Sequence, residues 1–338
     1  MALLEVKNLD VTLATNRGPA RAVRNLSFEL DRGQTLGIVG ESGCGKSMTA
    51  LALLGLLPEN GTTSGNIILD GQDLLTLDED AMCDVRGNRI SMIFQEPMTS
   101  LNPLHTIGRQ VTEPMLIHQG LGLDDARAEA VRLLERVGIA SAAQRLDSYP
   151  HQLSGGQRQR VMIAMALSCK PDVLIADEPT TALDVTIQGQ ILDLIADLVD
   201  ETGMSLILIS HDLGVIAETV DRVLVMYGGA GVETGPTASL FEHLAHPYTQ
   251  GLFAAVPRLG SGARRGEGAR LSTIPGLVPD LVDLPGGCTF AERCSISDGA
   301  CAGTVPDVHA VGDEAGHDVA CLKPAEAKAL FAGKEGTA

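Results

Sequence analysis

Apolar runs too short for helices alternate along the chain with segments of helical spacing. Strand-like runs dominate the first part, where a helix is predicted only for Ser47–Leu57, before Pro58. Beyond residue 170, strands and helices alternate, a pattern typical of an α/β domain with a largely parallel sheet. The predicted strands are Val23–Leu30, Thr35–Val39, Asn66–Leu69, Arg89–Phe94, Asp172–Ala176, Ser205–Ile209 and Val223–Tyr227.

The stretch from about residue 105 to 170 has a helical character. Apolar residues recur at helical spacing in Ala126–Val137, and Gly138 then ends the predicted helix. This stretch is therefore predicted to be an insertion into the α/β domain. After Gly235 the pattern weakens, and Arg258–Arg270, rich in Gly, Arg and Ser, reads as a linker.

Composition narrows the class of protein. The 338 residues suit one large domain with an appendage or two domains, and 44% apolar content is too high for a disordered chain. A formal charge of −18 argues against a protein that binds nucleic-acid phosphates. The longest apolar runs, Leu51–Leu57 and Val161–Leu167, are far shorter than the roughly 20 residues of a spanning helix. The charged N-terminus is unlike a signal peptide, so we expect a cytoplasmic chain.

A glycine-rich segment is the first candidate binding site in the sequence. Gly40–Ser47 fits G-x-x-x-x-G-K-[ST], follows the Thr35–Val39 strand and opens a helix. Backbone amides of such a loop surround phosphate oxygens, Lys46 would reach the β- and γ-phosphates of a nucleotide, and the Ser47 hydroxyl would coordinate Mg²⁺. The predicted ATP-binding residues are Gly40, Ser42, Gly43, Cys44, Gly45, Lys46, Ser47 and Met48.

Two carboxylates end the predicted strand that begins at Asp172. A buried parallel strand would deliver Asp177 and Glu178 to the carboxyl edge of the sheet, where ligands bind. Asp177 suits magnesium binding, and Glu178 is placed to act as a general base on the water that attacks the γ-phosphate.

Between these motifs lies Leu153–Gln157 (Leu-Ser-Gly-Gly-Gln), which resembles the signature of ABC-type ATPases. Gln95 matches the Q-loop, Ala182–Asp184 the D-loop and His211 the switch histidine of that family. The resemblance implies catalytic roles for Gln95, Glu178 and His211 and a magnesium site at Ser47, Gln95 and Asp177. It also implies that Ser154, Gly155, Gly156 and Gln157 bind the ATP held by a partner subunit.

The resemblance, which spans residues 3–235, also predicts the domain organisation. Residues 1–235 would form a P-loop ABC-type nucleotide-binding domain with an antiparallel β subdomain and a helical insertion at about 97–170. Residues 236–338 would form a small Cys-rich C-terminal extension. Two departures stand out: residues 1–27 contain no aromatic residue to stack on adenine, leaving Arg17, Arg21 or Arg24, and Met48 stands where many ABC domains carry Thr.

Other segments resemble ATPase subunits of oligopeptide, dipeptide and nickel importers. They are Gln95–Pro103, His246–Thr249 (His-Pro-Tyr-Thr) and the stretch from Ile274 to Cys294. The resemblance implies a peptide-import ATPase at the cytoplasmic face of the plasma membrane, with two permease subunits, a second ABC ATPase subunit and an extracytoplasmic solute-binding protein. Import of nickel or another small solute is an alternative, and a soluble, non-transport ABC ATPase is a more distant one.

Four of the seven cysteines, Cys288, Cys294, Cys301 and Cys321, lie in the last part of the chain. Their gaps are longer than the close pairs of most zinc sites, and four thiolates are the usual ligands of a [4Fe–4S] cluster. Family members of this type carry such a cluster, so the resemblance implies one here as a structural staple. Zinc, reduced thiols and disulfides are the alternatives.

Overall fold

The computed structural model describes residues 2–96, 100–181, 184–256, 273–312 and 316–335. The chain divides into two compact units, each made of several stretches. Unit 1 contains Met1–Leu4, Leu30–Thr35 and Leu69–Ile209, and unit 2 contains Glu5–Glu29, Leu36–Ile68 and Ser210–Ala338. The predicted domain boundary between residues 235 and 236 stays a prediction. None of the helices in the described ranges is both long and apolar enough to cross a membrane.

Unit 1 is built around three parallel strands, β6 (Ile90–Ile93), β7 (Val173–Asp177) and β8 (Ser205–Ser210). Every residue of β6 and β7 is buried, which explains why their sequences, apart from Ser91 and the terminal Asp177, are apolar rather than alternating. The other elements of unit 1 are β5 (Gln72–Asp73), α2 (Glu79–Val85), α4 (Ile107–His118), α5 (Leu123–Arg136), α6 (Ala142–Arg145), α7 (Gly155–Leu167), α8 (Val185–Thr202) and the short 3₁₀ turns Leu74–Thr76 and Pro150–Gln152.

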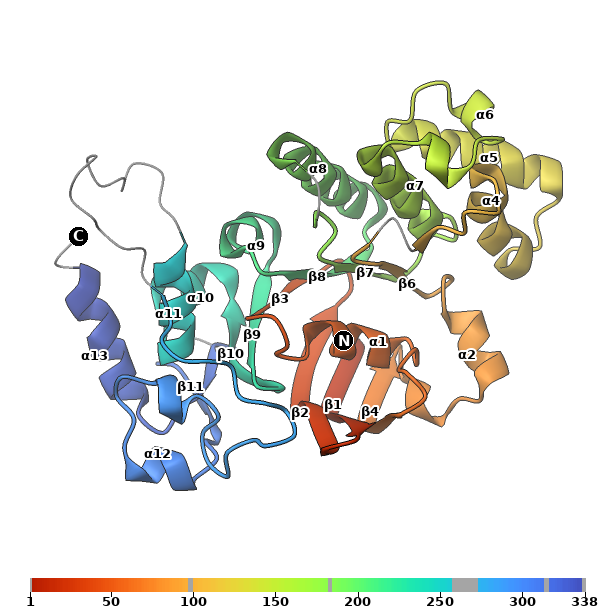
Figure 1. Ribbon diagram of the computed structural model, residues 1–338. Helices are drawn as coiled ribbons and strands as arrows, with labels where there is room; N and C mark the ends of the chain where they lie inside the picture. The colour runs from red at the N-terminus through yellow and green to blue at the C-terminus, as the bar shows by residue number, and fades with distance from the viewer. Residues whose placement is uncertain (1, 97–99, 182–183, 257–272, 313–315, 336–338) are drawn as a thin grey trace. The chain divides into compact units, whose positions relative to one another are not determined.

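The stretch predicted to be helical contains α4, α5, α6 and α7, which pack together in unit 1 (Figure 1). Helix α5 buries Ala126, Ala130, Leu133 and Leu134 along one face, as the apolar spacing predicts. It begins at Leu123 rather than at the predicted Ala126, because Asp124 and Asp125 form a favourable acidic first turn.

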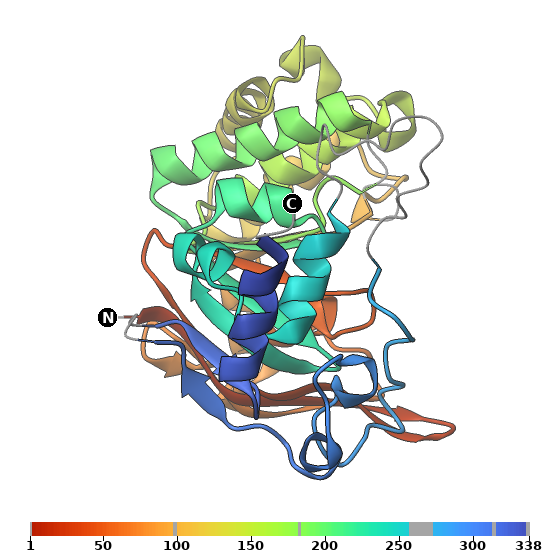
Figure 2. The ribbon, with the colours of Figure 1, turned by 90° about the vertical axis from the view of Figure 1, so that its left-hand side faces the viewer.

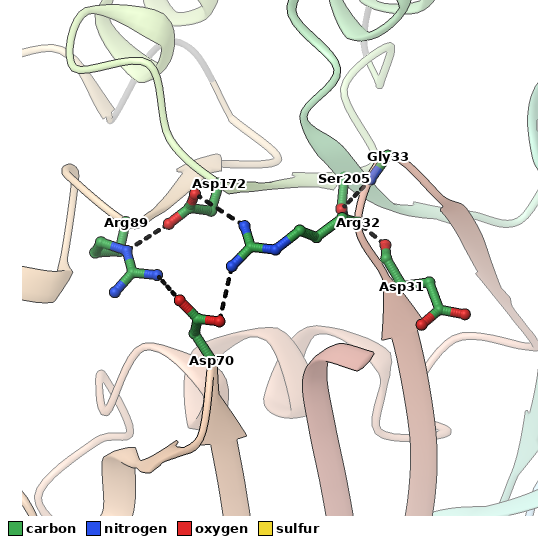
Figure 3. A network of polar contacts seen from close by, with 7 residues as sticks. All are labelled: Asp31, Arg32, Gly33, Asp70, Arg89, Asp172 and Ser205. Carbon is green, nitrogen blue, oxygen red and sulfur yellow. Dashed lines mark hydrogen bonds and ion pairs between the residues drawn. The ribbon is translucent and has the colours of Figure 1, made fainter. Parts of the chain in front are cut away.

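A ring of charges lies at the starts of the strands of unit 1 (Figure 3). Arg89 pairs with Asp172 and Asp70, and Arg32 pairs with the same two carboxylates, at 2.7 Å from Asp70 and 3.6 Å from Asp172. Beside the ring, Ser205 Oγ accepts a hydrogen bond from Gly33 N and donates to Asp31 O, both at 2.9 Å. These contacts tie the turn at residues 31–34 to the strands at the edge opposite their carboxyl ends.

Unit 2 holds the remaining strands in two groups. One group has the order β2 (Gly18–Asp31), β1 (Ala2–Thr15), β4 (Gly61–Leu69). In the other, β3 (Thr35–Val39) is parallel to β9 (Arg222–Tyr227), and β10 (Ala230–Pro236), β12 (Asp318–Ala320) and β11 (Val308–Ala310) follow in antiparallel pairs. The helices of unit 2 are α1 (Lys46–Leu53), α9 (Leu213–Thr219), α10 (Thr237–Glu242), α11 (Pro247–Ala255), α12 (Gly299–Gly303) and α13 (Pro324–Glu335), with a 3₁₀ turn at Ala291–Arg293.

Residues from the C-terminal extension (residues 236–338) complete the fold of unit 2. Strand β12 pairs with β10, and Figure 2 shows α13 beside α11, where Gln250 Nε2 donates to Ala327 O at 2.7 Å. Glu233 of β10 has a fully buried side chain whose carboxylate accepts from His317 Nε2 at 3.0 Å and from the amides of Ala245 and His246. Glu233 thus joins three segments at a buried point.

A Glu233→Ala variant is expected to lose about 3 kcal/mol of unfolding free energy, because two buried amides and His317 Nε2 would lose their acceptor. Urea denaturation followed by circular dichroism measures the change. Glu242→Ala, at an exposed position on α10, is the matched control and should change stability by less than about 0.5 kcal/mol. Equal midpoints for the two variants would contradict the role assigned to Glu233.

Candidate functional site

The loop Gly40–Lys46 connects β3 to α1 in unit 2, as the motif requires. Gly40, Gly43 and Gly45 have φ of 152°, 81° and 103°, a region that residues with a Cβ rarely adopt. A Cβ on Gly40 would lie 2.3 Å from Met226 O, and one on Gly45 would lie 2.3 Å from Ala22 O. At Gly40 and Gly45 a side chain is therefore excluded both by the positive φ and by a clash with a neighbouring backbone oxygen.

Lys46 is 6% exposed, and its Nζ donates to the carbonyl oxygens of Gly40 at 2.8 Å and Glu41 at 3.1 Å. The ammonium therefore lies inside the curve of the loop. Ser47 is half-buried in the first turn of α1, whereas Ser42 and Gly43 are exposed. Cys44 is fully buried, and burial raises the pKa of its thiol, which indicates a packing role.

The segment His246–Tyr248 also reaches this loop. Burial lowers the pKa of His246 to about 4, so its imidazole is neutral near pH 7, and its Nδ1 accepts from Tyr248 N to cap α11. The Tyr248 hydroxyl accepts from Glu41 N at 2.7 Å. In the sequence this segment is recognised only by its resemblance to a family. The structure shows that its Tyr248 contacts Glu41 of the phosphate-binding loop.

His211 and Gly40 line the same pocket of unit 2, which has a volume of about 480 Å³. Leu213 and the α11 residues Leu252 and Ala255 form part of its wall. The structure therefore brings the predicted switch histidine and the first glycine of the loop together. The three arginines considered for adenine contact other groups: Arg17 pairs with Asp280 and Asp283, Arg21 with Asp10, and Arg24 Nε donates to Gly228 O.

In unit 1 the structure brings Glu178 and Gln95 together. Gln95 Nε2 donates to Glu178 Oε2 at 3.1 Å, and Thr181 Oγ1 donates to the same oxygen at 2.9 Å. Glu178 has a φ of 45° and its amide donates to Ile209 O, so the backbone turns sharply where β7 ends. Asp177, the last residue of β7, is 4% exposed. Strained backbone of this kind clusters at functional sites.

The signature residues begin helix α7 of unit 1. Ser154 is the N-cap: its hydroxyl accepts from Gln157 N at 3.3 Å, and Gln157 Oε1 accepts from Ser154 N at 3.0 Å. This is a capping box, which leaves Ser154 and Gly155 exposed at a helix N-terminus. Such a terminus favours anions.

Parts of two other predicted motifs lie outside the described residues. These are Ala182 and Leu183 of the D-loop and residues 97–99 of the Q-loop extension. Asp184, the described residue of the D-loop, caps α8 by accepting from Ile187 N at 3.0 Å. The whole of the predicted linker, Arg258–Arg270, is likewise outside the described ranges.

The prediction of a Cys-rich extension with four clustered cysteines is not supported: the structure shows no compact four-cysteine ligand group among the described residues. Within the described ranges, no group of three or more His, Cys, Asp or Glu side chains could hold a metal ion. Cys288, Cys294, Cys301 and Cys321 nevertheless line one small cavity of unit 2, together with apolar side chains that include Phe290 and Ile296. Cys288 N also donates to Cys301 O at 2.8 Å. The thiols therefore face the same space without forming a site for a single ion.

Comparisons with known proteins show the family to which the chain belongs. The family description "ABC transporter" matches residues 23–181, and "Oligopeptide/dipeptide transporter, C-terminal region" matches residues 232–301. The chain is 49% identical over 326 residues to the "Probable peptide ABC transporter ATP-binding protein y4tR" of Sinorhizobium fredii, covering 96% of both chains. It is also 49% identical over 331 residues to the "Putative peptide import ATP-binding protein BMEII0863" of Brucella melitensis, covering 95% of this chain and 97% of that one.

Among solved structures, the chain resembles the ATP-binding cassette MJ0796, determined as a dimer in a post-hydrolysis state bound to ADP and Pi. The TM-score is 0.62 at 27% identity, over 69% of this chain and 98% of that chain. A parallel α/β fold with a G-x-x-x-x-G-K-S loop defines a P-loop nucleotide-binding protein. The chain belongs to the ABC transporter family of ATP-binding proteins, and it is an ATP-hydrolysing transport ATPase. The prediction of an α/β fold of the ABC ATPase type is therefore confirmed.

Proposed function

We propose that this chain is the ATP-hydrolysing subunit of a membrane importer for oligopeptides or dipeptides. One observation carries the proposal: 49% identity over nearly the full length to proteins named for peptide transport and peptide import, together with the matching C-terminal region. The proposed partners are two membrane permease subunits, a second ABC ATPase subunit and an extracytoplasmic solute-binding protein. The proposed place is the cytoplasmic face of the plasma membrane.

The proposed roles of the loop residues follow from their geometry. Lys46 would exchange its contacts with the loop carbonyls for the β- and γ-phosphate oxygens of ATP, and the loop amides would bind the remaining phosphate oxygens. Ser47, Gln95 and Asp177 offer a hydroxyl, an amide oxygen and a carboxylate, the oxygen donors that Mg²⁺ prefers. When bound, Mg²⁺ would neutralise part of the negative charge of the phosphates.

Glu178 is the proposed general base. The hydrogen bonds from Gln95 and Thr181 fix one oxygen of its carboxylate. An oriented carboxylate of this kind would take a proton from the water that attacks the γ-phosphate. His211, in the pocket that Gly40 lines, would contact the γ-phosphate and this water. Ser154, Gly155, Gly156 and Gln157 would bind the γ-phosphate of the ATP held by the second ATPase subunit.

Uptake of a labelled dipeptide and tetrapeptide by cells tests the proposed transport function. A strain without this chain is expected to lose uptake of at least one peptide; the wild-type chain should restore it and Glu178→Gln should not. A tagged wild-type chain should also co-purify with two permease subunits from detergent-solubilised membranes. Unchanged peptide uptake in the deletion strain, with nickel uptake lost instead, would overturn the peptide assignment.

We also infer that Cys288, Cys294, Cys301 and Cys321 hold a [4Fe–4S] cluster. The shared cavity and the all-thiol donor set support this inference. A cluster would spread its four thiolate ligands more widely than one zinc ion with Zn–S bonds of about 2.3 Å. Burial raises the pKa of the Cys288, Cys294 and Cys321 thiols, so bound iron would have to offset the cost of ionising them.

Protein purified without oxygen is expected to contain iron and acid-labile sulfide in equal amounts. Cys301→Ser should lose most of both, because Cys301 is the most buried of the four. Cys83→Ser, an exposed cysteine on α2, is the matched control and should keep both. Stoichiometric zinc, or protein without metal, would overturn the cluster assignment.

A further inference from the structure

Arg293 joins the C-terminal extension to the phosphate-binding loop. It lies in the 3₁₀ turn Ala291–Arg293, and its side chain is 5% exposed. Its guanidinium forms a two-pronged ion pair with Glu41, with Nη1–Oε2 at 2.6 Å and Nη2–Oε1 at 3.0 Å. Glu41 directly follows Gly40, the first residue of the loop. The pair therefore links positions 252 residues apart.

The remaining donors of Arg293 are also occupied. Nη1 donates to the Tyr227 hydroxyl at 3.2 Å, Nη2 to Ile274 O at 3.4 Å and Nε to Pro275 O at 2.8 Å. With the two bonds to Glu41, each of the five N–H groups has an acceptor. The guanidinium carbon also lies 5.7 Å from the ring centre of Tyr227. Arg293 is thus fixed in place by groups outside the loop.

Glu41 is held at three points. Arg293 binds its carboxylate, the Tyr248 hydroxyl accepts from its amide at 2.7 Å, and its carbonyl accepts from Lys46 Nζ at 3.1 Å. Tyr248 is itself fully buried, with ring centres 4.6 Å from Tyr227 and 5.4 Å from Phe290. Two of the three points therefore come from the C-terminal extension and one from the lysine that would bind phosphate.

We propose that Arg293 and Tyr248 are positioning residues of the phosphate-binding loop, and that ATP affinity consequently depends on the C-terminal extension. The inference rests on the proposed role of this loop in binding ATP. A loop with three glycines at positive φ has many conformations to lose on binding a nucleotide. Contacts that fix Glu41 remove part of that cost beforehand, which strengthens binding without any contact to the nucleotide.

Steady-state ATP hydrolysis by purified full-length variants tests the proposal. Arg293→Met and Glu41→Gln should each raise KM for ATP roughly tenfold, with kcat changed less than about threefold. Tyr248→Phe removes only the hydroxyl that accepts from Glu41 N and should raise KM by a smaller factor. Because Arg293 and Glu41 act as one unit, the double variant should be no worse than the poorer single variant.

Asp280→Asn is the matched control. It removes another ion pair between the extension and the N-terminal part of unit 2, Arg17–Asp280, which does not involve the loop. Its KM should equal that of the wild type. A merely structural role for Arg293 would lower the unfolding temperature and kcat while leaving KM unchanged, and that result would overturn the proposal. If Arg293→Met does not fold, an unchanged KM in both Glu41→Gln and Tyr248→Phe would overturn it equally.

The same experiment distinguishes this inference from the proposed role of the loop. If wild-type protein hydrolyses ATP and Lys46→Ala does not bind it, while the Arg293, Glu41 and Tyr248 variants match the wild type, the loop assignment stands and the positioning role fails. If Lys46→Ala binds ATP as the wild type does, the loop assignment fails and the inference fails with it.

Discussion

A Glu178→Gln variant is expected to bind ATP and to hydrolyse it at least 100-fold more slowly than the wild type, because general-base catalysis contributes roughly 10²- to 10⁴-fold. The amide still has an oxygen to accept from Gln95 and Thr181, so the local geometry should persist. It cannot take the proton of the attacking water. Phosphate release measures the rate, and equilibrium binding of a fluorescent ATP analogue measures the affinity.

Glu135→Gln provides the matched control for this substitution. Glu135 is exposed on α5, and the same change of charge there should leave the hydrolysis rate within about twofold of the wild type, as for most surface substitutions. A Glu178→Gln protein that hydrolyses ATP at the wild-type rate would contradict the general-base assignment. Slow hydrolysis with weak binding would instead show that Glu178 supports the nucleotide site without acting as its base.

A Lys46→Ala variant is expected to lose about 100-fold in ATP affinity. One or two charge-assisted hydrogen bonds to phosphate oxygens are worth about 3 kcal/mol, which corresponds to two orders of magnitude in Kd. The loop carbonyls of Gly40 and Glu41 would also lose the donor that now holds them, so the loop should become more mobile. Isothermal titration calorimetry with ATP in the Glu178→Gln background measures the affinity without turnover.

The control for this second prediction is Lys328→Ala. Lys328 is exposed on α13, so the substitution removes the same charge from the surface and should leave Kd unchanged. An ATP affinity of the Lys46 variant within twofold of the wild type would exclude Lys46 as a phosphate ligand. The phosphates of ATP would then not bind at Gly40–Ser47.

Local sequence patterns predict the bounds of secondary-structure elements well where nearly every residue of a strand is buried. The Thr35–Val39 strand coincides with β3, and Val223–Tyr227 matches β9 within one residue. The helix predicted for Ser47–Leu57 is shorter: α1 ends at Leu53, because Gly55 adopts a φ of 60° and closes the helix. Strand β1 was not predicted, and Asn8, with a φ of 49°, interrupts the alternation of its buried residues.

The candidate site was predictable only in part, for a physical reason. A motif such as Gly40–Ser47 is a local solution to phosphate binding, so its residues are adjacent in sequence. The ion pair between Glu41 and Arg293 depends on tertiary packing across 252 positions, and no local pattern signals it. In the sequence, Arg293 is only one residue of a segment that resembles a family. The structure shows that its guanidinium is buried and pairs with Glu41.

The five-fold hydrogen bonding of Arg293 has a consequence for how this chain can be divided or recombined. A truncated chain ending near Pro236 would leave the Glu41 carboxylate without its cation, the Glu41 amide without Tyr248 and Glu233 without His317. A chimera that takes its extension from a relative should work only if that relative also pairs an acidic residue in the loop with this arginine. We therefore expect residues 1–235 and the C-terminal extension to function only when both come from the same protein or from a relative with the same ion pair.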